Sequence, residues 1–212
     1  MVVLEPSCCS VFRDELNGLM PDSERAHRLM ESTFTLSEFL EKIVKDYEAP
    51  KLKRKAIVQG HCHHKAIMRL DDEEAVMKKM ALDFQTLDSG CCGMAGAFGY
   101  EADKYEVSIA CGERALFPAV RKADPSTLII ADGFSCKGQI EQGTSRHALH
   151  LAEVMALAIR NGGSETQAPY PEKSFVEPRV RAQHGSMKRA AAIALFTIAG
   201  GLALRWLWKR SS

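Results

Sequence analysis

The sequence contains no CxxC pair among its seven cysteines, and no secretory signal opens it. Met1–Leu4 leads directly into Glu5 and Pro6, without a basic segment or a long apolar run. A protein that is not exported is not expected to carry a disulfide framework, and a zinc ribbon normally shows CxxC pairs. The cysteines therefore indicate a metal or redox site of another kind.

The chain also lacks an overall excess of one charge, because its net charge is only +1. Residues 181–212 carry basic side chains and no acidic one, which leaves 1–180 mildly acidic. An acidic body argues against nucleic-acid binding, so we expect no nucleic-acid partner. The basic tail would suit an anionic surface such as lipid.

Residues 1–160 repeat one pattern, in which a short apolar run is followed by a loop and then by a segment with helical periodicity. Such alternation predicts an α/β fold with a parallel sheet and helices on both of its faces. The strands are expected at 2–4, 55–60, 84–87 and 127–131, and the helices at 11–20, 23–30, 36–47, from about 65, 103–120 and 145–159.

Five cysteines follow the expected strands closely: Cys8, Cys62, Cys91, Cys92 and Cys136. In parallel sheets ligands bind outside the carboxyl ends of the strands, so these cysteine loops should meet at one edge. Thiolates bind soft metals and iron–sulfur clusters. An adjacent pair of cysteines suits a cluster with several metal atoms, and we predict that Cys62, Cys91, Cys92 and Cys136 hold one. Cys8 could add a further ligand. The alternatives for the whole set are a zinc site, or cysteines that are simply small buried side chains at strand ends.

Three histidines surround one of these cysteines, namely His61, His63 and His64 around Cys62. An imidazole can ligate a metal or donate a hydrogen bond to a cluster sulfur. The same side chains could also be polar loop residues that cap the following helix, and direct ligation is the less favoured of these roles. The sequence leaves these roles open.

Three segments resemble the cysteine-rich CCG domain: His61–Ala66, Asp88–Gly96 and Asp132–Cys136. This domain occurs in one of the subunits of heterodisulfide reductase and in the iron–sulfur parts of glycolate and D-lactate oxidases. The resemblance extends over residues 2–160 and is strongest to the C-terminal region of fused FAD-linked 2-hydroxy-acid oxidases. The chain departs from the family in having one full repeat, preceded by a segment that is similar to the end of another, and in carrying Gln139 where some members have a further cysteine.

The resemblance implies an iron–sulfur cluster of the 4Fe-4S type that transfers electrons for a flavin-linked oxidoreductase acting on 2-hydroxy acids. This chain has no glycine-rich flavin fingerprint, so FAD would belong to a partner dehydrogenase subunit. Two alternatives remain at this point. The chain could be a zinc-binding assembly module, or a truncated remnant of a larger fused oxidase.

The C-terminal part changes character after residue 160. Glycines and prolines in 161–188 indicate a linker, and 189–210 is expected to form a transmembrane helix. Ala190–Trp208 has the length needed to cross a bilayer, with tryptophans and basic residues at its end. Electrons would then pass toward a membrane acceptor, with the body on the cytoplasmic side of the inner membrane. A packed or dimerising helix is the alternative.

Overall fold

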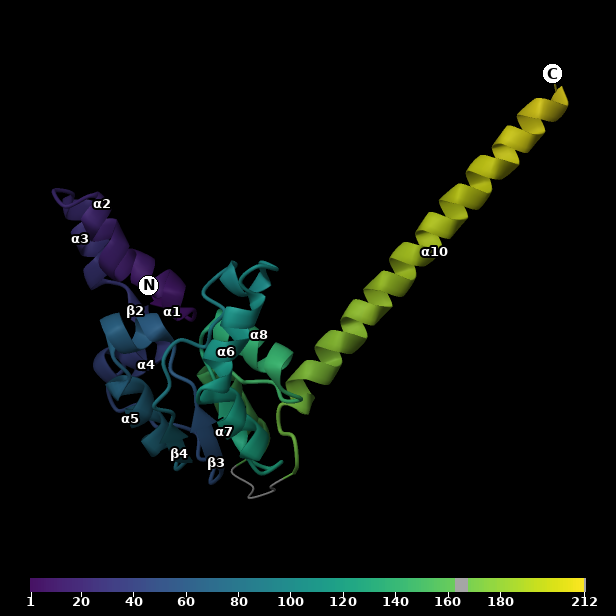
Figure 1. Cartoon of the computed structure of the whole chain (residues 1–212). Helices are drawn as coiled ribbons and strands as arrows, with labels where there is room; N and C mark the ends of the chain where they lie inside the picture. Colours follow the sequence, from purple (N-terminus) through teal and green to yellow (C-terminus); the bar gives the residue numbers. More distant parts are fainter. Residues whose placement is uncertain (163–167, 212) are drawn as a thin grey trace. The chain divides into compact units, whose positions relative to one another are not determined.

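The computed structural model describes residues 1–162 and 168–211, without the side chains at 184, 192, 194–196 and 198–211. The chain divides into two compact units, Met1–Glu172 and Lys173–Ser212. The first unit contains the strands and the helices α1 to α9 (Figure 1). All seven cysteines lie within its residues.

A three-stranded parallel sheet forms the centre of the first unit. Its strands are β3 (Lys55–Val58), β4 (Asp83–Thr86) and β5 (Leu128–Ile130), with β3 between the other two. Lys55 pairs with Asp83, and Ala56 pairs with Leu128. The α/β class and the parallel pairing are therefore confirmed, and these strands lie within two residues of their expected bounds.

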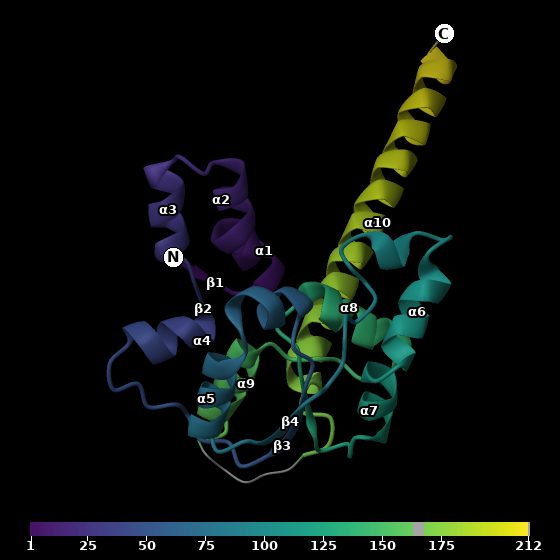
Figure 2. The same ribbon diagram turned by 60° about the vertical axis from the view of Figure 1, so that its left-hand side comes forward.

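Helices cover both faces of this sheet. Alternate strand residues point to opposite faces, so each strand packs against both helix layers. Ile57 and Ile129 pack in a core that includes side chains of α7 (Leu116–Lys122) and α8 (Phe134–Gly143). Figure 2 shows α5 (Asp71–Lys79) and α9 (Leu151–Arg160) on the other side of the strands from α7.

The first predicted strand belongs to a separate sheet. β1 (Val2–Val3) pairs with β2 (Phe34–Thr35) and with no strand of the central sheet. Between them the chain is mostly helical, and α1 carries Cys8 on a helix rather than in the expected loop. These elements are α1 (Pro6–Ser10), the π-helical turn η1 (Val11–Glu15), α2 (Leu16–Leu19) and α3 (Glu24–Glu31).

The remaining helices differ in part from the expected ranges. The predicted helix 36–47 is α4 (Leu36–Glu38) with the π-helical turn η2 (Phe39–Ile43), and the helix expected from 65 is the turn η3 (His64–Met68) followed by α5. The segment 103–120 forms two helices, α6 (Tyr105–Glu113) and α7, after a 3-10 turn, η4 (Phe98–Tyr100). Helix α8 was not expected, and α9 begins at Leu151 rather than near 145.

The second unit is one helix, α10 (Lys173–Ser211), which includes Pro178. It covers the later part of the expected linker 161–188 and the whole of 189–210. Most side chains of the predicted transmembrane segment lie outside the described residues. Within the described part of the chain, none of the helices has both the length and the apolar character needed to cross a bilayer. The membrane anchor therefore has no support there.

Candidate metal centre

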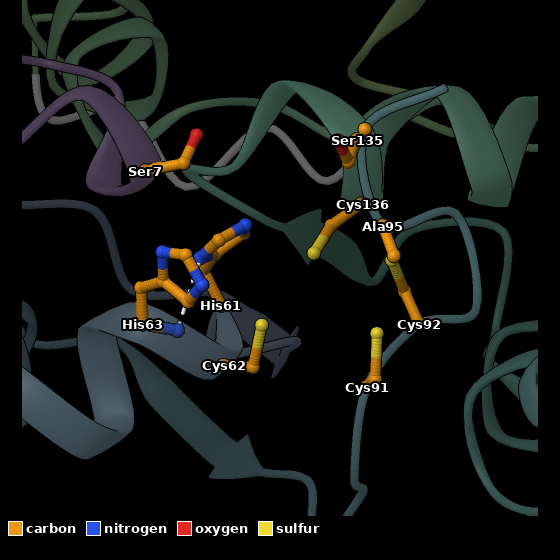
Figure 3. A pocket seen from close by; sticks show the side chains of 10 residues that line it. Ser7, His61, Cys62, His63, Cys91, Cys92, Ala95, Ser135 and Cys136 are labelled. Carbon is orange, nitrogen blue, oxygen red and sulfur yellow. Dashed lines mark hydrogen bonds between the residues drawn. The ribbon is translucent and has the colours of Figure 1, made fainter. Parts of the chain in front are cut away.

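A cavity of about 370 Å³ lies where the chain leaves the carboxyl ends of β3, β4 and β5. The turn after β3, the loop after β4 and the first turn of α8 form most of its wall, and α1 adds one residue. Figure 3 shows this arrangement. The lining residues are Ser7, His61, Cys62, His63, Cys91, Cys92, Ala95, Gly96, Ser135 and Cys136.

The four cysteines that we predicted as ligands all line this cavity, as free thiols. Cys92 and Cys136 are buried, Cys62 is half-buried and Cys91 is exposed. The sulfur atoms of Cys62, Cys91 and Cys136 are turned into the cavity (Figure 3). The structure thus brings together four thiols from three separate segments of the chain, and two of these thiols are buried.

The thiols differ in acidity because two of them share a hydrogen bond. The thiol of Cys136 donates to Cys92 and lowers the pKa of Cys92 to about 6. The same hydrogen bond, together with burial, raises the pKa of Cys136. Burial also raises the pKa of Cys91. Only thiolates bind metal, so binding would release protons from Cys136 and Cys91.

Gly93 gives the cysteine pair its backbone conformation. Its φ angle of 102° lies in a region that L side chains rarely adopt, and an added Cβ would lie 2.1 Å from the carbonyl oxygen of Ser108. The buried Gln139 closes the same contact from α8, since its Nε2 donates to that carbonyl at 2.9 Å. Gln139 thus connects α6 to α8 at the position where some members of the resembled family have a cysteine.

Two side chains hold the loop before the pair against the end of β3. The ammonium group of Lys65 donates to the carbonyl oxygen of Ser89 at 2.7 Å. The hydroxyl of Ser89 donates to Oε1 of Gln59 at 2.6 Å. These contacts fix the position at which Cys91 enters the cavity.

His61, His63 and Ser7 lie across the cavity from Cys91, Cys92 and Cys136 (Figure 3). His61 is buried, and burial lowers its pKa, so its ring is neutral at neutral pH. Its Nδ1 accepts a hydrogen bond from the backbone N–H of His63 at 3.2 Å. His63 is exposed, and its Nδ1 lies 2.9 Å from the hydroxyl oxygen of Ser10. His64 instead contacts the buried Glu73 at 3.2 Å, outside the cavity wall.

The N-terminal segment reaches this site through Glu5, a residue that sequence reasoning did not single out. The Glu5 carboxylate accepts hydrogen bonds from the Ser7 hydroxyl at 2.7 Å and from the backbone N–H of Phe134 at 2.6 Å. It therefore caps α1 and the start of α8, the helix that carries Cys136. No sequence signal could have connected positions so far apart.

The other cysteines are placed elsewhere. Cys8 is exposed on α1 and does not line the cavity, although its neighbour Ser7 does. Cys9 is buried, and Cys111 is half-buried on α6. The expected fifth ligand, Cys8, is thus separate from the other four.

The residues present fit a bulky, thiolate-bound group. A cavity of about 370 Å³ is many times the ~30 Å³ that one water molecule occupies in the liquid. Among the described residues, no three His, Cys, Asp or Glu side chains gather closely enough to hold a single metal ion. Four thiols around so large a space match the ligands of an iron–sulfur cluster.

Comparisons with known proteins find parts of dehydrogenases. The chain is 27% identical over 157 residues to D-2-hydroxyglutarate dehydrogenase of Pseudomonas putida. The aligned segment covers 73% of this chain and 15% of that protein. It is 32% identical over 111 residues to a subunit of the anaerobic glycerol-3-phosphate dehydrogenase of Escherichia coli, covering 51% of this chain and 27% of that subunit. The chain therefore spans less than a third of the length of either relative. No family model matches it. No solved structure matches it either.

Proposed function

We propose that this chain is an iron–sulfur electron-transfer module of a flavin-linked oxidoreductase that acts on a 2-hydroxy acid or a similar hydroxy substrate. The observation that carries the proposal is the convergence of Cys62, Cys91, Cys92 and Cys136 on one cavity. Such thiolates bind soft metals, and they come from the segments that follow the strands, at the edge of the sheet where α/β proteins bind their ligands.

The size of the cavity favours a cluster of the 4Fe-4S type over zinc. A structural zinc ion draws four ligands to within about 2.3 Å of one point and leaves no free volume. Here the thiols surround about 370 Å³. Adjacent cysteines such as Cys91 and Cys92 can reach separate metal atoms of a cluster more easily than a single ion.

The relatives support the oxidoreductase part of the proposal, because both carry dehydrogenase in their names. One is named as a subunit, which is consistent with a module that works beside a separate dehydrogenase. FAD would then be held by that partner. Because the chain matches only part of each relative, the substrate and the partner are part of the proposal.

When bound, an iron–sulfur cluster would accept and release single electrons at a potential set by its surroundings. The chain's own residues would hold it and control those surroundings. Cys92 and Cys136, which are buried, would hold the group away from bulk water. Cys91 is exposed and brings the edge of the site to the surface, where a redox partner can approach.

The full-length chain, produced with iron and sulfide and purified anaerobically, tests the proposal. We expect bound iron and sulfide with the broad visible absorbance of a cluster, and the loss of both in a Cys91→Ser, Cys92→Ser variant. Cys111→Ser is the matched control, because Cys111 is a free cysteine that does not line the cavity. A colourless wild-type protein with stoichiometric zinc would contradict the proposal.

A further inference from the structure

His63 has a ring whose hydrogen position is fixed by a neighbouring hydroxyl group. Ser10 has one hydroxyl hydrogen, which it donates to the carbonyl oxygen of Ser7 at 2.8 Å. The same oxygen lies 2.9 Å from Nδ1 of His63, so at that contact it must accept. The hydrogen-bond assignment therefore places the ring hydrogen of His63 on Nδ1. Nε2 of His63 is left with a free lone pair.

His61 has the opposite arrangement. Its Nδ1 accepts the hydrogen bond from the backbone N–H of His63, so the hydrogen of the neutral ring is on Nε2. The two rings are packed edge to face, with centroids 5.3 Å apart. Figure 3 shows both rings on the same wall, facing the sulfurs of the cysteines. That wall therefore offers one lone pair and one N–H donor.

We propose that Nε2 of His63 is a further protein ligand, beside the four thiolates, to one of the irons of the cluster. The Nε2–H group of His61 donates a hydrogen bond to one of the cluster's sulfurs. This inference rests on the proposed function. A histidine that binds a metal usually donates its other ring N–H to a fixed acceptor, which sets the tautomer and the ring orientation. The hydroxyl of Ser10 is that acceptor for His63.

The placement of α1 explains why a histidine, and not Cys8, takes this role. Cys8 is exposed and lies outside the cavity wall. Ser7 lines the cavity from α1, and the buried Ser10, one helical turn later, contacts the ring of His63. Helix α1 thus contributes to the site by holding the ring of His63. His64 is engaged with Glu73 instead.

Pulsed EPR of the full-length, cluster-loaded chain tests this assignment directly. The protein is produced with ordinary histidine and with histidine labelled with the heavy nitrogen isotope, and the cluster is examined in its paramagnetic redox state. We expect a strong nitrogen coupling, of the size given by a directly bound imidazole, that changes with the label. It should be lost in His63→Ala and kept in His61→Ala. His147→Ala is the control, because that histidine pairs with Glu141 and does not line the cavity.

A second variant covers the case in which His63→Ala does not fold. His63→Cys should keep the iron content while the nitrogen coupling disappears, because a thiolate replaces the imidazole. His61→Ala should lower the reduction potential, because one hydrogen bond to the anionic cluster is lost. A loaded wild-type cluster without a directly bound nitrogen, or a coupling that survives in His63→Cys, would overturn the inference and leave the proposed function intact. A wild-type chain that binds no cluster would instead refute the proposed function.

Discussion

Buried polar groups are paired with protein groups at the amino end of the central sheet, whereas at its carboxyl end polar groups line a cavity. At the amino end, Arg146 and Glu172 form a buried ion pair with an Nε–Oε1 distance of 2.6 Å. Arg146 also donates to the carbonyl oxygen of Thr127 at 2.7 Å. Arg54 donates to the carbonyl oxygens of Ser126 and Ala168. Each of these guanidinium groups is surrounded by acceptors.

At the carboxyl end, the polar groups surround an open space. The thiols of Cys62, Cys91 and Cys136 and the rings of His61 and His63 line the cavity, and their few hydrogen bonds within the protein leave part of their bonding capacity turned toward the open space (Figure 3). Buried polar groups cost free energy unless they find partners. Partners supplied by the protein indicate a structural role, as at the amino end. Donors held around a cavity indicate a ligand.

Removing Arg146 should have the largest effect on stability. Arg146→Ala leaves Glu172 buried without its ion-pair partner, and such losses cost about 3–5 kcal/mol. Chemical denaturation should show this as a large drop in the midpoint. Arg121→Ala is the matched control, because Arg121 pairs with Glu113 at the surface and such pairs contribute at most about 1 kcal/mol. Equal effects of the two variants would remove the distinction between the ends of the sheet.

Gly93→Ala should damage the carboxyl end specifically. The positive φ angle alone costs about 1–3 kcal/mol for a residue with a Cβ, and the added atom would clash with the Ser108 carbonyl. We expect a clear loss of iron binding, measured as iron per folded chain. Gly90→Ala, on the other side of the cysteine pair, is the control, because its added Cβ would meet nothing within 4 Å. Normal iron content in Gly93→Ala would show that the loop tolerates another conformation.

The smallest effect concerns the pH dependence of the metal-free chain. Its Cys92 thiol has a pKa of about 6, below the ordinary value of 9.0. The stability contributed by this thiolate is therefore complete above pH 9 and is lost as the pH falls through 6. Ultraviolet absorbance should show a thiolate titrating near pH 6. Cys136→Ala should move this transition upward, because the hydrogen bond from Cys136 is its main cause. An unchanged transition would contradict this origin.

The sequence was sufficient to predict the alternating architecture and the four cysteines at one sheet edge. Strong apolar runs such as Leu128–Ile130 have few alternatives to a buried strand. Helix α8 was missed because it contains glycines and its N-cap residue, Gly133, has no side chain to cap it, so its local preference is weak. Burial of Cys136 and Ile140 against the core stabilises it instead.

Some other differences between the expected and the observed structure could have been predicted from the sequence, and others could not. The break between α6 and α7 had a signal, since Pro118 cannot donate to the carbonyl of residue 114. The pairing of β1 with β2 could not be predicted, because a short apolar run does not indicate which strand it will pair with. The different hydrogen positions of His61 and His63 could not be predicted either, since one depends on Ser10, 53 residues away.

The contact between Glu5 and Phe134 has a consequence for how the site is assembled. It joins residues 129 positions apart, and the cysteines that line the cavity extend from Cys62 to Cys136. During synthesis on the ribosome, the early loops must wait as free thiols until the segment around residue 136 has emerged and folded. A long-range site of this kind closes late. Under the proposed function, metal loading would therefore wait until that segment is in place, with the cysteines open to oxidation in the interval.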